Sequence, residues 1–231
     1  MRQKLAADPT TAPRQAVLAV VLQVRERGLH VLLWQRARPP FDGAWALPGG
    51  ELGNETLEDS MRRQLADKVD VRELAHLEQL GSWSEPGRHP RHRELATAFL
   101  GLVPADHDPV LPGDTLWHHV DALPPLAFDH GGIVLAGRER LRGKLSYTNV
   151  GFALAPRTFT LSELRGVYAA ALGHDVSATN LKRVLLRRGV LEPTGDRREP
   201  GRAGGRPAEV YRFRSRALEI TDPFAVLRPP A

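Results

Sequence analysis

Three polar residues in the first half of the chain stand at the spacing of one helix face. Gln64, Asp67 and Lys68 lie in the stretch GGELGNETLEDSMRRQLADKVDV, residues 49 to 71. Side chains three and four positions apart converge on the same side of a helix. Three carboxylates at such positions would bind Mg²⁺, a hard ion that takes oxygen ligands. This chain instead supplies an amide, one carboxylate and an ammonium, whose formal charges sum to zero, and we therefore expect no metal site.

The same stretch resembles the Nudix box, and the sequence WALPGG precedes it as in most members of that family. The positions that match the box in register are Gly49, Glu55, Arg63, Leu65 and Val71. The three glutamates of the box are replaced by Gln64, Asp67 and Lys68, and its late glycine is replaced by Asp70. Without bound metal, the chain cannot easily activate water or neutralise the charge of a diphosphate. We therefore expect little or no hydrolysis and assign no catalytic residue and no cofactor.

Two other interpretations of this stretch stay open. The first is an ordinary amphipathic helix that follows a glycine turn. The second is an active ADP-ribose pyrophosphatase of the Nudix class fused to a DNA-binding domain, in which Glu55 and Asp67 hold a metal through water. Lys68 argues against the second, because an ammonium would repel a cation 4 Å away by about 4 kcal/mol at an effective dielectric near 20.

Segments outside the box resemble the ADP-ribose-binding branch of Nudix domains. They are a basic loop, EPGRHPRHRE, between two predicted strands, and the sequence LAFDH. The resemblance implies a pocket for ADP-ribose or a related derivative, and the residues we assign to it are Arg36, Gly49, Gly50, Arg88, Arg91, Phe128, Asp129 and His130. Guanidinium groups fit phosphate bidentately. Phe128 would stack on a base or pack in the pocket wall, and Asp129 and His130 would bind a ribose or orient their loop.

Hydrophobic periodicity predicts the elements that position these residues. Apolar runs predict strands at 15–25, 29–36, 77–83 and 95–103. The four-residue spacing of Leu57, Met61, Leu65 and Val69 predicts a helix with one buried side, and a further helix is expected from about Gly131. Mixed strands and helices favour an α/β fold, and the resemblance to the Nudix family implies that the N-terminal part is an α/β/α sandwich with a mixed sheet.

The sequence changes character at Arg157. Thr160 and Glu163 form a capping-box pattern that begins a helix, and Gly173 suits its end. SATNLKRVLLRRG then predicts a second helix, capped by Ser177, and two short strands follow, joined by a basic hairpin. This order predicts a C-terminal winged helix-turn-helix domain. From Arg157 to the end there are 14 basic and 8 acidic residues, whereas the rest of the chain has 18 and 19, so the basic excess lies in this part.

The second helix and the hairpin together indicate binding to double-stranded DNA. A recognition helix places its early residues on base edges, and a wing contacts phosphates. We assign the first role to Thr179, Asn180, Lys182 and Arg183, and the second to Arg187, Arg197, Arg198, Arg202 and Arg206. The alternatives are a solvated charged face and a nucleic-acid binder without sequence preference.

Both halves together resemble the NrtR family, the Nudix-related transcriptional regulators of NAD metabolism. The junction KLSYTNVGFALAPRTFTLSELRGVY, the helix TNLKRVL and the hairpin GRPAEVYRF carry this resemblance. It implies a homodimeric repressor of NAD biosynthesis or salvage genes that binds a palindromic operator and senses ADP-ribose or a related NAD derivative. The sign of the effector's action does not follow from the sequence.

The expected organisation is a disordered N-terminus at 1–12, a Nudix-like effector-binding domain at 13–150 and the winged helix domain at 151–231. The chain has no cysteine, which excludes disulfides and thiol catalysis. Its longest apolar run is about half of what a membrane span needs. We therefore expect a cytoplasmic protein that does not contact a membrane.

Overall fold

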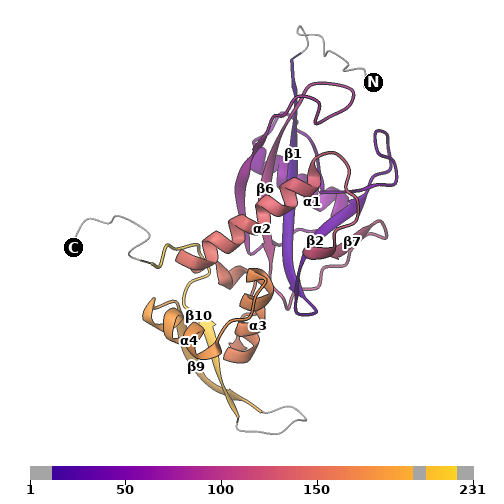
Figure 1. Cartoon of the computed structure of the whole chain (residues 1–231). Coiled ribbons are helices and arrows are strands. Elements are labelled where there is room, and N and C mark those ends of the chain that lie inside the picture. The colour runs from indigo at the N-terminus through magenta and orange to yellow at the C-terminus, as the bar shows by residue number, and fades with distance from the viewer. Residues whose placement is uncertain (1–11, 200–206, 223–231) are drawn as a thin grey trace, which may run out of the picture.

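The computed structural model describes residues 12–199 and 207–222 and has a mixed sheet above a smaller helical part (Figure 1). In the large sheet the order is β3-β2-β1-β6-β5, with β4 added beside β1 and β7 beside β2. The strands are β1 (Arg14–Arg25), β2 (Gly28–Gln35), β3 (Trp45–Ala46), β4 (Gly49–Glu51), β5 (His76–Trp83), β6 (Glu94–Val103) and β7 (Thr115–His119).

The central strand β1 is buried on both faces, which explains its unbroken run of Val, Leu and Ala. It pairs in parallel with β6, so that Arg14 lies opposite Glu94 and Gln23 opposite Val103. The side chains of Val17, Ala19 and Val21 share one apolar cluster with α1 (Leu57–Val69). Those of Leu18, Val20 and Leu22 share another with α2 (His130–Tyr147). The alternation of a strand thus sends successive residues to opposite helices.

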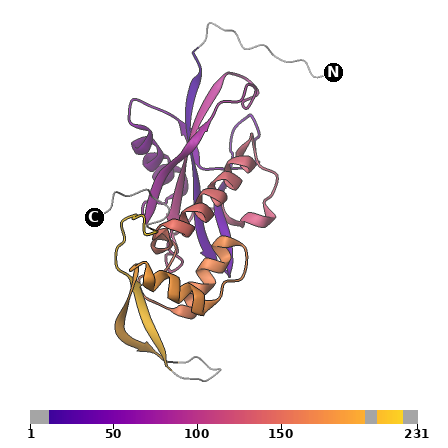
Figure 2. The ribbon, with the colours of Figure 1, turned by 60° about the vertical axis from the view of Figure 1, so that its left-hand side comes forward.

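The predicted α/β/α sandwich is confirmed, because α1 and α2 cover opposite faces of the sheet (Figures 1 and 2). Thr56 caps α1 by accepting a hydrogen bond from the Asp59 N–H. Asp70 ends the helix in the left-handed region at φ 52°, where the Nudix box has its late glycine. Aspartate tolerates this region better than most residues with a side chain. The four predicted strands are present with ends shifted by one residue at most, whereas β3, β4 and β7 were not predicted.

The C-terminal part has the helix, helix and hairpin order of a winged helix, as predicted. Its elements are η2 (Val150–Ala153), β8 (Phe159–Thr160), α3 (Leu161–Leu172), α4 (Ala178–Arg187), β9 (Leu191–Arg198) and β10 (Ala208–Phe213). The capping box of Thr160 and Glu163 is present in full, and Gly173 ends α3 at φ 76°. The strands form a sheet of order β8-β10-β9, and the β9–β10 hairpin projects away from the molecule (Figure 2).

The two parts share one continuous core. The apolar cluster around β1 and α2 continues through Phe152 and Phe159 into Leu164 and Tyr168 of α3. The segment after β10 returns to this junction, where the buried Asn149 side chain donates to the Ala217 carbonyl and accepts from the Glu219 N–H. The junction is therefore held by apolar packing and by backbone hydrogen bonds. No helix in the described ranges is long and apolar enough to span a membrane.

Helix α2 approaches β1 most closely at Gly137, where an added Cβ would lie 2.7 Å from Val20 Cγ1. We predict that Gly137→Ala lowers the free energy of unfolding by about 1 to 2 kcal/mol, because overpacking outweighs the gain in helix propensity. Gly143→Ala on the same helix is the matched control, since no atom lies within 4 Å of its added Cβ. It should raise stability by up to about 1 kcal/mol. Urea unfolding of both variants checks this, and an equal effect at the two sites would contradict it.

Candidate functional site

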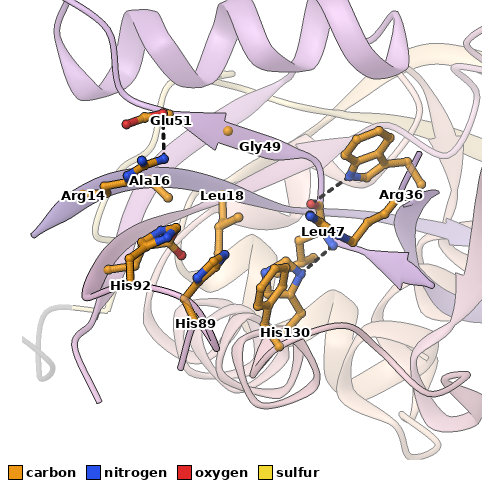
Figure 3. A pocket seen from close by; sticks show the side chains of 14 residues that line it. Arg14, Ala16, Leu18, Arg36, Leu47, Gly49, Glu51, His89, His92 and His130 are labelled. Atoms are coloured by element: carbon orange, nitrogen blue, oxygen red, sulfur yellow. Dashed lines mark hydrogen bonds and ion pairs between the residues drawn. The ribbon is translucent and has the colours of Figure 1, made fainter. Parts of the chain in front are cut away.

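An open cavity lies where β4 joins β1, beside the loops that follow β2 and β5 and the segment before α2 (Figure 3). Its volume is about 140 Å³, so an ADP-ribose-sized molecule would extend beyond it. Five of the residues assigned to effector binding line it: Arg36, Gly49, Gly50, Phe128 and His130. The sequence did not point to its other polar and aromatic wall residues, which are Arg14, Trp34, Glu51, His89, His92 and Glu94.

Phe128 supports the guanidinium of Arg36 in the cavity wall. The Arg36 Cζ atom lies 4.7 Å from the centre of the Phe128 ring, and His89 stacks on that ring with centroids 5.3 Å apart. Arg36 Nε donates to the Pro40 carbonyl at 2.9 Å. Burial lowers the pKa of Arg36, and the nearby Glu94 raises it. The ring of Phe128 is thus already in contact with Arg36 and His89. These contacts are those of a supporting wall residue and not of an open platform for base stacking.

Arg88, which we assigned to a diphosphate, is held by two carboxylates in this structure, and its role in binding phosphate stays a prediction. Its guanidinium is 2% exposed and donates two hydrogen bonds to Asp129, at 3.0 and 2.8 Å, and one to Glu94, at 2.6 Å. A buried arginine with these partners ties the loop after β5 to the segment before α2. Asp129 is thereby used in orienting its loop, which was one of its two expected roles. Arg91 is exposed and lies outside the cavity wall.

His130 is buried at the start of α2 and binds the short segment between β3 and β4. The Leu47 N–H donates to His130 Nδ1 at 3.0 Å (Figure 3). Burial lowers the pKa of His130 to about 3, the charges of Arg88 and Arg36 act in the same direction, and Asp129 opposes them. The ring is therefore neutral at physiological pH, as an accepting Nδ1 requires. This contact supports the loop-orienting role over ribose binding.

Both glycines of the cavity wall stand where a side chain has no room. Gly49 has a φ of 156°, and an added Cβ would lie 2.1 Å from the Val17 carbonyl oxygen. An added Cβ on Gly50 would lie 2.6 Å from the amide of Gln64. The close pairing of β4 with β1, in which Leu18 lies opposite Gly49, explains the first restriction. Gly49 thus lets β4 approach β1, and Gly50 leaves room for the Gln64 side chain of α1.

The three altered box positions do not fit a magnesium ion. Gln64 is buried, and its amide donates to the Glu51 carbonyl at 3.4 Å. The Asp67 carboxylate is 62% exposed and lies 3.7 Å from the Arg63 guanidinium, which also binds Glu55 at 2.6 Å. The Lys68 ammonium donates to the Gly49 carbonyl. The face that would collect carboxylates around Mg²⁺ is therefore occupied by an amide and an ammonium.

His89, His92 and Glu94 form another group of ligand-type side chains, with one atom of each within 4.8 Å of the others. His92 Nε2 lies 3.2 Å from Glu94. The two imidazole rings stack with centroids 3.7 Å apart and planes 28° apart. Histidine binds a metal in the plane of its ring, and stacked rings do not converge on a common point in that way. The arrangement is that of a stacked aromatic wall.

The side chains assigned to DNA occupy the exposed side of α4 and the hairpin. Thr179, Asn180, Arg183 and Arg187 are exposed, and Arg183 donates to the Asn180 side-chain oxygen at 2.8 Å. Lys182 differs, because it lies 3.6 Å from Glu209 and 5.2 Å from the Tyr211 ring centre. On the wing, Arg197 is exposed, whereas Arg198 pairs with Glu163 at 2.5 Å. Arg202 and Arg206 lie outside the described residues.

Comparisons with known proteins agree with this architecture. Residues 12–136 match the model of the Nudix domain, and residues 151–213 match that of the NrtR DNA-binding winged helix domain. An ADPR-responsive transcriptional repressor NtrR of Acinetobacter baylyi is 31% identical, over 87% of this chain and 82% of its own. Shewanella oneidensis NrtR in complex with a 27mer DNA has a TM-score of 0.74 and 33% identity, covering 87% of this chain and 93% of its own. The Nudix domain of that NrtR with ADP-ribose has a TM-score of 0.52 and 31% identity, covering 58% and 93%.

The buried neutral His130 predicts a loss of stability in acid. Its pKa is about 3 in the folded protein against an ordinary 6.5, so between these values the unfolded chain binds more protons and stability falls as pH falls. From a pH of about 7.5 to about 5, the unmodified protein should lose about 2 kcal/mol more than the His130→Asn variant. Urea unfolding at the two pH values checks this. His89 and His118 are unchanged in both proteins, so equal losses would contradict the assigned state of His130.

Proposed function

The chain belongs to the NrtR family, in which a Nudix domain precedes an NrtR winged helix domain, and from that membership we propose that it is a transcriptional repressor that senses an NAD derivative. We propose ADP-ribose as the effector and genes of NAD biosynthesis or salvage as the target. One observation carries the proposal. The cavity that Arg36 lines and the exposed basic side of α4 belong to two parts of the chain that share one continuous apolar core.

Sequence-specific DNA binding is supported by the surface of α4. Asn180 and Arg183 lie on its exposed side near the helix start, where a recognition helix contacts base edges. The hydrogen bond from Arg183 to the Asn180 oxygen directs the amide N–H groups of Asn180 outward. We propose that Arg197, which is exposed on the projecting hairpin, contacts phosphate. We propose that residues 13–150 and 151–231 are the two domains of each chain. We also propose that the protein is a cytoplasmic homodimer, because two symmetrically related winged helices would match a palindromic operator.

Effector binding is supported by the charge state of the cavity. Arg36 lines the cavity and takes part in no ion pair among residues 12–199 and 207–222. Its planar guanidinium is suited to a diphosphate. The rings of His89 and Phe128 add an aromatic lining beside it, which suits contact with a nucleoside, although their stacked faces are already in use. The relatives that share this architecture include a repressor that responds to ADP-ribose and a domain that binds it.

We propose that the protein binds ADP-ribose without hydrolysing it. Gln64 and Lys68 turn the metal-binding face of the Nudix helix into one that accepts no divalent ion. The remaining carboxylates of the box, Glu55 and Asp67, are both in contact with Arg63. Without a metal-bound water, the chain offers no strong nucleophile to attack a diphosphate at neutral pH.

Helix α2 offers a path between the two sites. It begins at His130, in the cavity wall, and ends at Tyr147, next to the winged helix. At that end Arg188, which follows α4, donates to the Ser146 carbonyl and pairs with Asp222 at 3.1 Å. A ligand that binds one arrangement of α2 and α4 more tightly shifts the DNA affinity, and DNA shifts the ligand affinity by the same factor.

The proposal is tested with the full chain by titrating ADP-ribose in magnesium buffer, with and without a palindromic fragment from upstream of an NAD-synthesis gene. We expect ADP-ribose to change the dissociation constant for that fragment and to remain intact, with no AMP released. Steady AMP release at an enzymatic rate would identify an active hydrolase instead. Binding to random duplex with equal affinity would identify a non-specific nucleic-acid binder.

Asn180→Ala tests the recognition helix in the same assay. We expect a loss of about 1 to 3 kcal/mol in discrimination between the operator and a random duplex, because a base contact is removed. Arg197→Ala is the contrasting variant, which should weaken binding to both duplexes and reduce the salt dependence. Retention of full sequence preference by Asn180→Ala would place the recognition surface elsewhere.

Arg188→Gln tests the path through α2. We expect the factor by which ADP-ribose changes DNA affinity to fall by about 2- to 30-fold, since a contact at the joint is lost. Binding of ADP-ribose alone should be nearly unchanged. Arg62→Gln, which removes the same charge from the exposed side of α1, is the control. An unaltered factor in Arg188→Gln would show that coupling does not pass through this contact.

A further inference from the structure

Lys68 is a positively charged side chain that lies against the wall of the cavity, although it is not itself one of the lining residues. It stands on α1 at a position where the Nudix box has a glutamate. Its ammonium donates to the Gly49 carbonyl and lies 4.9 Å from the centre of the Trp34 ring. Both of these contacts line the cavity. None of the ion pairs within residues 12–199 and 207–222 includes Lys68.

This position is unfavourable for a lysine in the free protein. Burial lowers the pKa of the ammonium, and the charges of Arg36 and Arg63 lower it further. A desolvated charge with no counterion reduces stability. The carboxylates closest in sequence are engaged elsewhere, since Asp67 contacts Arg63 and Asp70 contacts Arg72. Lysine normally extends its charged end into water, whereas here the ammonium is held on a backbone carbonyl.

Arg36, which lines the cavity, is a second cation close to Lys68. It too has no ion-pair partner in the described part of the chain, and its charge is close enough to disfavour the charged form of Lys68. Two like charges that approach one another beside a cavity attract an anion with more than one charge. A diphosphate has the charge and the two groups of oxygen acceptors to contact both side chains.

We propose that Lys68 is a resident cation that replaces the divalent metal of a Nudix site and binds the effector's diphosphate together with Arg36. This inference rests on the proposed function and adds that effector binding needs no metal. An ammonium donates hydrogen bonds and carries one charge, which is enough to bind phosphate. It does not make a bound water acidic as a metal does. Lys68 therefore lets the cavity retain the diphosphate and removes the means of cleaving it.

The alternative is a structural lysine that only fixes the Gly49 carbonyl. The two roles predict opposite effects on the free protein. A structural lysine stabilises it, so that Lys68→Met would lower the unfolding temperature. An anion-binding lysine without a counterion destabilises it, so that the same variant would unfold at an equal or higher temperature and would bind the ligand more weakly.

The test is calorimetric titration of the full chain with ADP-ribose, once in EDTA and once in MgCl₂, together with thermal unfolding without ligand. We expect equal dissociation constants of the unmodified protein in the two buffers. Lys68→Met should weaken binding by about 10- to 100-fold in both, the usual range for a charge-assisted hydrogen bond. Lys68→Arg should retain most of the affinity. Arg62→Met, which removes a positive charge from the exposed side of the same helix, should bind ADP-ribose normally.

Unchanged affinity in Lys68→Met, or a lower unfolding temperature with unchanged affinity, would overturn the inference and leave the proposed function intact. A requirement of the unmodified protein for Mg²⁺ would also overturn it. Absence of any ADP-ribose binding by the unmodified protein would reject the proposed effector itself. Operator binding, measured in the same variants, shows whether the winged helix part remains folded.

Discussion

The burial of β1 between two helices is the constraint on which the rest of this structure depends. Every second side chain of the strand packs toward α1 and the others toward α2, so neither helix can shift without opening a core. The edge of the same strand pairs with β4, which places Gly49 and Gly50 in the cavity wall. The Nudix helix, the cavity and the helix that leads to the winged helix are therefore all positioned by one strand.

This chain keeps the Nudix fold and differs from a metal-binding Nudix protein in the charges of the side chains on α1. A Nudix site with three carboxylates binds a metal and uses it to cleave a diphosphate. Here the Lys68 ammonium contacts the Gly49 carbonyl, and Gln64 contributes a buried amide. The same cavity can then accept an anion directly. Hydrolysis would destroy the ligand, so the proposed loss of hydrolysis suits a protein that reports on ligand concentration.

The junction between the two parts is suited to carry a signal because it is packed and directional. Helix α2 connects the cavity to the winged helix without an interruption, and Asn149 and Arg188 bind the returning C-terminal segment at its end. Packed elements of this kind move as units between discrete arrangements. In the proposed coupling, this packing would carry a small displacement at His130 to α4.

The sequence by itself determined the features that depend on local pattern: the long strands, the apolar side of α1, the capping box of Thr160 and Glu163, and the altered acids of the box. These follow from periodicity and residue type, which neighbours along the chain reveal. Only the tertiary structure decided where charged side chains find partners. Arg88 binds Asp129, Arg198 binds Glu163, and Lys68 has no counterion among the residues that the structure describes. The short strands β4 and β7 likewise form only because β1 and β2 offer open edges, since pairing across distant segments leaves no periodic signal in so few residues.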